Sequence, residues 1–209
     1  MIKKFLVYAK SDGIGEVTNM AIKSLASLFF SYSQTCYLML DVLDFVPSGG
    51  LNSSHFNIKE ITSSEEALSL GFDRLSSCPI SKWFLAGSRL FVGFDGETPV
   101  CYTWTHFHQY RINSTALFGL SDAEEWIGPT FVLKSHRGLG YNKAQIAYQV
   151  AASSSKKIYT SANIGNVASV KSFERLGFRL LGRTVTLRIA GMCIRKKISG
   201  AEGLQSKFK

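Results

Sequence analysis

The sequence lacks paired cysteines and long apolar runs. Its four cysteines are widely separated and form no C-x-x-C pair, which argues against a zinc site or a disulfide framework and fits reduced thiols. No stretch approaches the roughly 20 apolar residues that span a bilayer. The apolar core of the N-terminal M-I-K-K-F-L-V-Y-A-K is shorter than that of a secretory signal. We therefore expect a cytoplasmic protein without a bound metal and without a membrane partner.

Charge is also sparse, since charged residues make up 19% of the chain and hydrophobic residues 45%. These proportions are ordinary for a globular protein and exclude a disordered one. The 24 Lys and Arg against 15 Asp and Glu give a formal charge of +9. A basic surface suits an anionic partner, such as a nucleic acid, a membrane surface or a phosphorylated small molecule. No nucleic-acid-binding module is recognisable, so we expect no nucleic-acid partner.

Turn-forming residues suggest how the chain is organised. The segment P-S-G-G-L-N-S-S, Pro47–Ser54, is the strongest linker candidate. Before it, K-K-F-L-V-Y-A and C-Y-L-M-L-D-V-L are typical of strands, with a helix between them near Val17–Phe30. We expect residues 1–50 to form a short N-terminal β-α-β appendage of unknown role. Residues 51–199 would then form one domain, and residues 200–209 a disordered tail.

Beyond the linker, the pattern predicts a mixed α/β (α+β-like) domain. The run around D-G-E-T-P is a strong hairpin signal, and Gly128-Pro129 interrupts a later strand in the way that a bulge or a ladder break does. Strands are expected at Phe56–Ile61, Trp126–Leu133, Lys157–Ala162, Arg179–Ile189 and Met192–Ile198, and helices from Thr62, near Ser81–Ala86, at Gly140–Ala152 and at Val167–Leu176.

One loop carries a chemical signal. H-R-G-L-G-Y-N, His136–Asn142, follows a strand and opens a helix. A helix N-terminus offers unpaired N–H groups and the positive end of the dipole to an anion. Glycines let the backbone approach a phosphate closely. The spacing fits neither the dinucleotide loop G-x-G-x-x-G nor the P-loop. Taken alone, the stretch is equally compatible with a structural turn.

A second motif stands some thirty residues later. It reads N-I-G-N-V-A-S-V-K-S-F-E-R-L-G-F, Asn163–Phe178. Together the two motifs resemble those of the GNAT-type, acetyl-coenzyme A-dependent N-acetyltransferases, whose loop is written [QR]-x-x-G-x-[GA] and whose later helix is written N-x-x-[AS]-x-x-x-[YF]-x-x-x-G-F. The resemblance covers about Phe56–Ile198. It implies a central, twisted, mostly antiparallel sheet flanked by helices.

The resemblance also implies how acetyl-CoA, the co-substrate, would bind. The loop would cradle its pyrophosphate, and the strand at Phe131–Leu133 would splay from the strand at Lys157–Ala162 to admit the pantetheine arm. Amides near Val132 or Leu133 would polarise the thioester carbonyl. Asn166 would contact the arm, or act only as a helix N-cap. The residues expected to bind the coenzyme are Phe131, Val132, Leu133, Arg137, Gly138, Leu139, Gly140, Tyr141, Asn142, Asn166, Ser169 and Phe173.

The sequence departs from the family pattern at three places, of which Lys134, where proline is common, is the least consequential. Asn142 stands where Gly or Ala is preferred, although asparagine tolerates unusual φ. Phe173 stands where many members carry a tyrosine that protonates the leaving thiolate, and phenylalanine has no proton to give. The acid must then be another group or solvent, or be unnecessary, or the transfer activity has been lost.

Direct attack on the thioester needs a neutral amine, and three residues are candidates for the base. Glu125 and Glu124 begin the strand that leads to the loop, where relatives place a carboxylate acting through water. His106 shares one strand face with Tyr102, Trp104, His108 and Tyr110 by the period of two. That face either lines the acceptor cleft or is an ordinary outer face of the sheet.

The leading hypothesis is an N-acetyltransferase that moves an acetyl group directly, in a ternary complex, from acetyl-CoA to a primary amine of a small molecule. The acceptor would be an amino sugar or another amine, and a homodimer is compatible with this interpretation. A non-catalytic acyl-CoA-binding module on the same fold is the alternative, motivated by Phe173. A third hypothesis is an interaction protein that works through residues 1–50.

Overall fold

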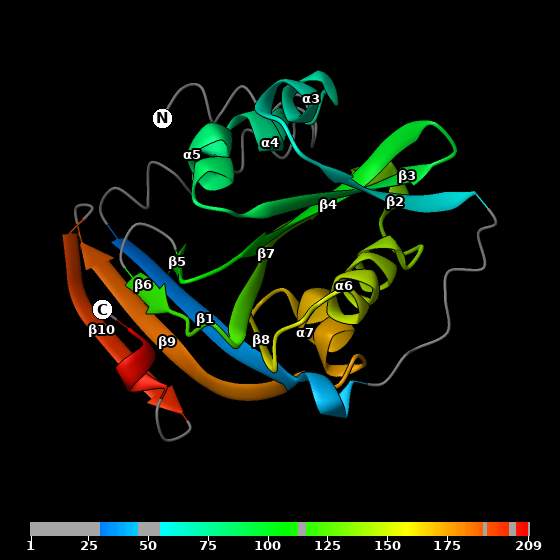
Figure 1. The fold of residues 1–209 in the computed structure, drawn as a ribbon. Coiled ribbons are helices and arrows are strands. Elements are labelled where there is room, and N and C mark those ends of the chain that lie inside the picture. The colour runs from blue at the N-terminus through cyan, green and yellow to red at the C-terminus, as the bar shows by residue number, and fades with distance from the viewer. Residues whose placement is uncertain (1–29, 46–54, 113–115, 190–191, 201–203, 209) are drawn as a thin grey trace.

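The computed structural model describes residues 30–45, 55–112, 116–189, 192–200 and 204–208. An eight-stranded sheet in the order β10-β9-β1-β8-β7-β4-β3-β2 organises the chain (Figure 1). Its strands are β1 (Phe30–Asp41), β2 (Phe56–Ile61), β3 (Arg89–Asp95), β4 (Thr98–His106), β7 (Glu124–Val132), β8 (Lys157–Asn163), β9 (Arg179–Ile189) and β10 (Met192–Gly200). Neighbouring strands pair antiparallel except β7 and β8. The predicted mixed, mostly antiparallel fold class is confirmed.

Two groups of helices cover the two faces of this sheet (Figure 1). On one face lie the short helices α3 (Ser64–Ser69), α4 (Asp73–Ser76) and α5 (Ile80–Leu85). The same face carries the two-stranded hairpin of β5 (Gln109–Ile112) and β6 (Ala116–Gly119). On the opposite face lie α6 (Tyr141–Ala151) and α7 (Val167–Glu174). Short 3-10 turns are η1 (Val42–Asp44), η2 (Lys134–His136) and η3 (Gln205–Lys207).

Local signals in the sequence account for many element boundaries. The hydroxyl of Ser63 accepts a hydrogen bond from the Glu66 N–H at 3.1 Å and caps the start of α3. The tight turn at Gly96, where φ is +61°, joins β3 to β4 as the D-G signal predicts. The expected strands after residue 55 and the helices near Ser81, Gly140 and Val167 are all present within a few residues of their predicted ends. The sequence did not predict α4 or the β5–β6 hairpin.

The predicted N-terminal appendage is wrong for β1. This strand lies inside the main sheet, where it pairs with β8 on one side and β9 on the other. Leu38 and Leu40 are fully buried against the face that carries α6 and α7, and Tyr37 is buried against the other face. A strand with both faces covered is part of the core. Residues 1–29 and 46–54, which include the predicted first strand, helix and linker, lie outside the described residues.

The predicted disordered tail is also wrong for its described part. Leu204 is buried, and Phe208 packs edge-on against the rings of Tyr37 and Phe118. Lys207 reaches a carboxylate on β7. Leu204 and Phe208 thus pack into the aromatic core, and their burial offsets the entropy of ordering this segment.

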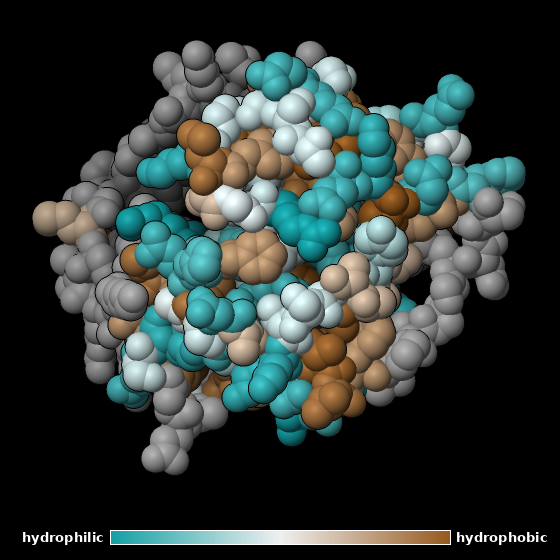
Figure 2. Space-filling view, viewed as in Figure 1, coloured by the Kyte–Doolittle hydropathy of each residue, from teal (hydrophilic) through white to brown (hydrophobic). Residues whose placement is uncertain are grey.

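Polar and apolar side chains are interspersed over the face shown in Figure 2, as on most folded domains. No helix in the described part of the chain is long and apolar enough to cross a membrane.

Candidate active site

Two glycines shape the loop before α6. Gly138 and Gly140 have φ values of +84° and +88°, in the left-handed region that favours glycine. Gly140 is the N-cap of α6, and no side chain caps this end. The first bond inside the helix runs from the Ala144 N–H to the Gly140 carbonyl at 3.0 Å. The N–H groups of the first turn therefore have no partner within the helix, and an anion can accept hydrogen bonds from them.

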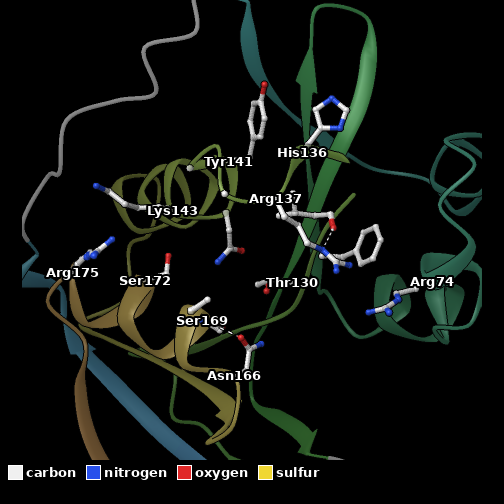
Figure 3. Close-up of a pocket in the computed structure, with 16 residues that line it drawn as sticks. Arg74, Thr130, His136, Arg137, Tyr141, Lys143, Asn166, Ser169, Ser172 and Arg175 are labelled. Carbon is white, nitrogen blue, oxygen red and sulfur yellow. Dashed lines mark hydrogen bonds between the residues drawn. The ribbon is translucent and has the colours of Figure 1, made fainter. Parts of the chain in front are cut away.

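The loop opens onto a surface hollow of about 620 Å³, the basic groove (Figure 3). Four basic side chains line it, and its described lining contains no carboxylate. Arg74 of α4 approaches from the side opposite to Lys143 and Arg175 (Figure 3). Such a charge distribution suits a ligand with several phosphates. The lining residues are Arg74, Thr130, Phe131, Val132, His136, Arg137, Gly138, Gly140, Tyr141, Asn142, Lys143, Asn166, Ala168, Ser169, Ser172 and Arg175.

Contacts at the rim of the groove position two of these arginines. The Arg137 Nε donates to the Val132 carbonyl at 3.2 Å, so its side chain folds back over the end of β7 (Figure 3). The Arg74 guanidinium lies over the Phe131 ring, 5.1 Å from its centroid. Both charges are therefore held beside the last residues of β7.

β7 and β8 separate next to the groove. Their parallel pairing runs from Glu124 and Lys157 to Trp126 and Tyr159 and ends there, although both strands continue. The Thr160 hydroxyl then donates to the Ile127 carbonyl at 2.8 Å in place of a backbone partner. The splay that the resemblance predicts is therefore present, and it begins just before Gly128-Pro129. Beyond it, the edge of β7 that faces β8 is open to a ligand.

The separation forms a second hollow of about 500 Å³, the uncharged cleft. Phe173, on α7, belongs to one face of the sheet, whereas Trp126 and Ile112 belong to the core of the other face. The cleft therefore runs between the strands from one face toward the other. It is lined by Ser33, Thr35, Tyr110, Ile112, Trp126, Ile127, Gly128, Pro129, Thr130, Thr160, Ser161, Ala162, Asn163, Asn166, Ser169 and Phe173. Thr130, Asn166 and Ser169 line the groove as well, so the two hollows adjoin each other at these residues.

Most residues predicted to bind the coenzyme border these hollows. Nine of them line the groove, and Phe173 lines the cleft: Phe131, Val132, Arg137, Gly138, Gly140, Tyr141, Asn142, Asn166 and Ser169 are the nine. Leu139 is 57% exposed and lines neither. The Leu133 N–H is already bonded to the Val100 carbonyl at 2.9 Å. In an antiparallel ladder the neighbouring residue points its N–H the other way, so Val132, not Leu133, directs its N–H away from β4, and Val132 lines the groove.

Asn166 combines the two roles considered for it. Its Oδ1 accepts from the Ser169 N–H at 3.2 Å and caps α7. Its Nδ2 makes no hydrogen bond within the described chain and lies where groove and cleft meet. The N-cap role is therefore present, and the remaining donor is available to a ligand.

Glu124 is tied into a network on the hairpin side of the sheet. It forms a salt bridge with Lys207 at 2.5 Å, and it accepts from the Tyr159 hydroxyl and the Ser121 N–H. Burial by itself would raise the pKa of this carboxyl. The bonds from Lys207, Ser121 and Tyr159 outweigh burial and lower it to about 2. A carboxylate held this firmly ionised is a poor base, and it lines neither hollow.

Glu125 points to the opposite face, because successive strand residues alternate. It is buried and accepts from the Ser155 hydroxyl at 3.3 Å, near the end of α6. Burial raises its pKa, against the lowering effect of Ser153, Ser155 and Arg89. Glu125 also lies outside both hollows. The position of the two glutamates therefore does not support the expectation that either faces the thioester.

His106 lies in the aromatic core beneath α5. Its Nδ1 is 2.9 Å from the Ser88 hydroxyl, and its ring contacts those of Trp83 and Tyr110. Burial lowers its pKa to about 4, with the Gly128 carbonyl acting in the opposite direction, so the ring is neutral at pH 7. Tyr102 and Trp104 are buried in the same core. Tyr102, Trp104 and His106 are thus covered and do not line an open acceptor cleft, whereas His108 is exposed beyond the end of β4 and Tyr110 lines the cleft from β5.

Sequence reasoning missed several residues of the two hollows. Arg74, Lys143 and Arg175 add charge to the groove, and Thr130 joins the groove to the cleft. Lys143 and Arg175 lie inside or beside the two motifs, so a count of basic residues near the motifs would have found them. Arg74 comes from a distant element and carries no local signal.

Comparisons with known proteins address the fold. No family model matches the chain, and no curated protein matches it. Solved structures do match. A GCN5-related N-acetyltransferase from Kribbella flavida aligns with a TM-score of 0.54 and 13% identity over 90% of this chain and 66% of that one. The chain has the fold of the GNAT-type N-acetyltransferases.

Two further structures agree with this fold. A tandem GNAT protein from the clavulanic acid biosynthesis pathway aligns with a TM-score of 0.56 at 15% identity, over 83% of this chain and 59% of that one. A GNAT-family acetyltransferase from Colwellia psychrerythraea gives 0.52 at 14% identity, over 81% and 60%. The chain thus spans two thirds or less of each of these three GNAT structures. At such identities the similarity concerns the GNAT fold, and the chemistry has to be argued from the site.

Proposed function

We propose that this protein is an acetyl-CoA-dependent N-acetyltransferase that acts on a primary amine of a small molecule by direct transfer in a ternary complex. The observation that carries the proposal is that the basic groove directly adjoins the uncharged cleft. One end is suited to the phosphates of a nucleotide, and the other end is suited to an uncharged arm and its thioester.

The groove supplies the interactions that the donor needs. The first-turn N–H groups of α6 would donate hydrogen bonds to the pyrophosphate, and Arg137, Lys143 and Arg175 would balance its charge. The free edge of β7 would pair with the amide groups of the pantetheine arm, as β8 would have done had the strands stayed together. The Val132 N–H would donate to the thioester carbonyl oxygen.

The acceptor would enter the cleft from the hairpin side of the sheet. Its amine nitrogen attacks the carbonyl carbon, a C–N bond forms, the C–S bond breaks, and one proton passes from nitrogen to sulfur or to solvent. The hydroxyl and amide side chains of the cleft can bind the hydroxyls of an amino sugar or a similar amine. An uncharged lining disfavours an ammonium ion, so we expect the free-base form of the amine to react.

Two measurements test this proposal. Calorimetry with acetyl-CoA and with coenzyme A should show one site per chain. Thiol release from acetyl-CoA should then rise when members of an amine panel are added, with glucosamine, spermidine, free lysine and aniline as its classes. A chain that binds neither acetyl-CoA nor coenzyme A would rule the proposal out.

The second candidate function is a non-catalytic acyl-CoA-binding module. Phe173 and the positions of Glu124 and Glu125 favour it, because none of them brings a proton donor or acceptor to the cleft. Tight acetyl-CoA binding without thiol release across the whole panel would support the module. Turnover with any one amine would exclude it.

A further inference from the structure

On the wall of the cleft formed by α7, the ring of Phe173 has no acidic hydrogen to offer a leaving sulfur. Phe173 is 1% exposed and packs against Phe178, with ring centroids 5.2 Å apart. When the C–S bond breaks, the sulfur leaves with the electron pair and needs a hydrogen-bond donor or a proton. Another group on the cleft is therefore needed if the protein assists this departure.

The opposite wall carries a phenol. Tyr110 of β5 lines the same cleft as Phe173. Its ring stacks on Trp126, at 4.8 Å and 18° between planes, and its centroid lies 4.6 Å from that of the His106 ring. Tyr110 forms no side-chain hydrogen bond with the described part of the chain. The ring is fixed by its two neighbours, and the hydroxyl is available to a ligand.

We propose that Tyr110 supplies the hydroxyl that Phe173 lacks and donates to the sulfur atom as it leaves. This inference rests on the proposed acetyl transfer. The amine forms the C–N bond, the C–S bond breaks, and the sulfur takes the phenolic proton. The phenolate then recovers a proton from the newly acylated nitrogen, directly or through water, so that the enzyme returns to its starting state.

The surroundings of Tyr110 suit this role. Burial raises the pKa of the phenol, and the thiol of Cys78 acts in the same direction, so the group is protonated at neutral pH. The neighbouring His106 is neutral there, since burial lowers its pKa to about 4. The Ser88 hydroxyl holds the His106 ring at 2.9 Å. The phenol thus faces uncharged groups, and its phenolate form would be reprotonated quickly.

The test removes one oxygen atom. Tyr110→Phe keeps the stacked ring and should lower kcat about 100-fold with the best amine of the panel, with KM for acetyl-CoA within about twofold. Tyr37→Phe is the matched control. Tyr37 is buried in the same aromatic cluster, and its hydroxyl accepts from Thr184 at 3.0 Å, away from the cleft. This control should retain kcat.

A second variant tests whether kcat can be rescued. Phe173→Tyr in the Tyr110→Phe background places a hydroxyl on the opposite wall and should restore kcat at least tenfold over the single variant, by about 1.4 kcal/mol. An active wild type with an unaffected Tyr110→Phe variant would overturn the role of Tyr110 and leave the function standing. Equal losses in Tyr37→Phe, or no rescue, would also overturn it. A wild type that releases no thiol with any amine would instead refute the function itself.

Discussion

The basic groove and the uncharged cleft share three residues, yet they are built in opposite ways. The groove is formed largely by one loop and the starts of two helices, and its affinity would come from backbone N–H groups and basic side chains. The cleft is assembled from β1, β5, β7, β8 and α7, and it contains no charged side chain among its lining residues. Backbone N–H groups and basic side chains would thus bind the anionic donor, whereas uncharged side chains would surround the neutral reaction centre next to it.

This difference predicts which changes each hollow tolerates. The groove should respond to charge and to ionic strength, because its contacts are electrostatic and lie near the surface. The cleft should respond to single atoms and to the packing behind its walls, because its geometry is set by buried rings. The following variants sharpen or break this contrast, from the largest expected effect to the smallest.

Charge reversal in the groove should have the largest effect. Arg137→Glu should weaken acetyl-CoA binding about 100-fold, because a charge-assisted contact is lost and a repulsive one is gained. Lys171→Glu is the matched control, since it makes the same charge change on exposed α7 outside the groove. Calorimetry at low and at high salt measures both. Similar losses in the two variants would mean that only the net charge matters.

Behind the cleft, Glu124→Gln should lower the stability by about 2 kcal/mol at pH 7, because Lys207 loses its partner. The pKa of Glu124 in the folded chain, about 2, is below its ordinary value of 4.5. The contribution of Glu124 to stability is therefore fully present above roughly pH 5 and is lost as the pH falls toward the folded-state pKa. Urea unfolding should show the difference in stability from wild type closing between about pH 5 and pH 2. A difference in stability that does not change with pH would mean that Glu124 acts through packing alone.

Asn166 lies where the two hollows meet, and it can be substituted so that the N-cap of α7 is either kept or lost. Asn166→Asp retains an oxygen that caps α7 but removes Nδ2 and adds negative charge, so acetyl-CoA binding should weaken about tenfold at unchanged Tm. Asn166→Ala should lower the stability by about 1 kcal/mol through loss of the cap. Thermal unfolding and calorimetry on both variants separate the roles. Unchanged binding in the aspartate variant would leave Asn166 as a cap only.

The smallest effect is expected at Glu125. Glu125→Gln should change kcat by less than about threefold, because the side chain is buried on the α6 face, outside both hollows. Steady-state rates between about pH 6 and pH 9 are the measurement. A fall of two orders of magnitude would restore Glu125 as the base and would break the contrast between groove and cleft.

The sequence predicted the groove better than the cleft for a physical reason. Gly138, Gly140 and Asn166 act through the conformation of their own backbone, so a short motif contains most of their information. The side chains that complete the cleft meet only through the sheet. Ser33 and Tyr110 are far apart in the sequence and from each motif, and no local spacing places them together.

The two glutamates show the same limit on a smaller scale. Glu124 and Glu125 are adjacent in the sequence, and both were reasonable bases from their place before the loop. Alternation along β7 sends one to Lys207 and the other to Ser155, on opposite faces. The alternation was predictable, but the partner on each face was not, because Lys207 belongs to a segment predicted to be disordered.

β1 was misassigned for a related reason. Its apolar run predicted a strand, and the turn formers after it predicted a boundary. Neither pattern reveals which strands lie beside it, because the pairing involves residues much later in the chain.

That pairing has a consequence for how the chain is made. The Cys36 thiol donates to the Ala162 carbonyl, 126 positions away in the sequence. During synthesis β2, β3, β4 and β7 can associate as they emerge, but β1 has to wait for β8 and β9. An apolar strand made early and paired late is exposed to association with other chains, and contacts between such distant residues slow folding. We therefore expect chaperone assistance, or a lower growth temperature, to raise the yield of folded protein during expression.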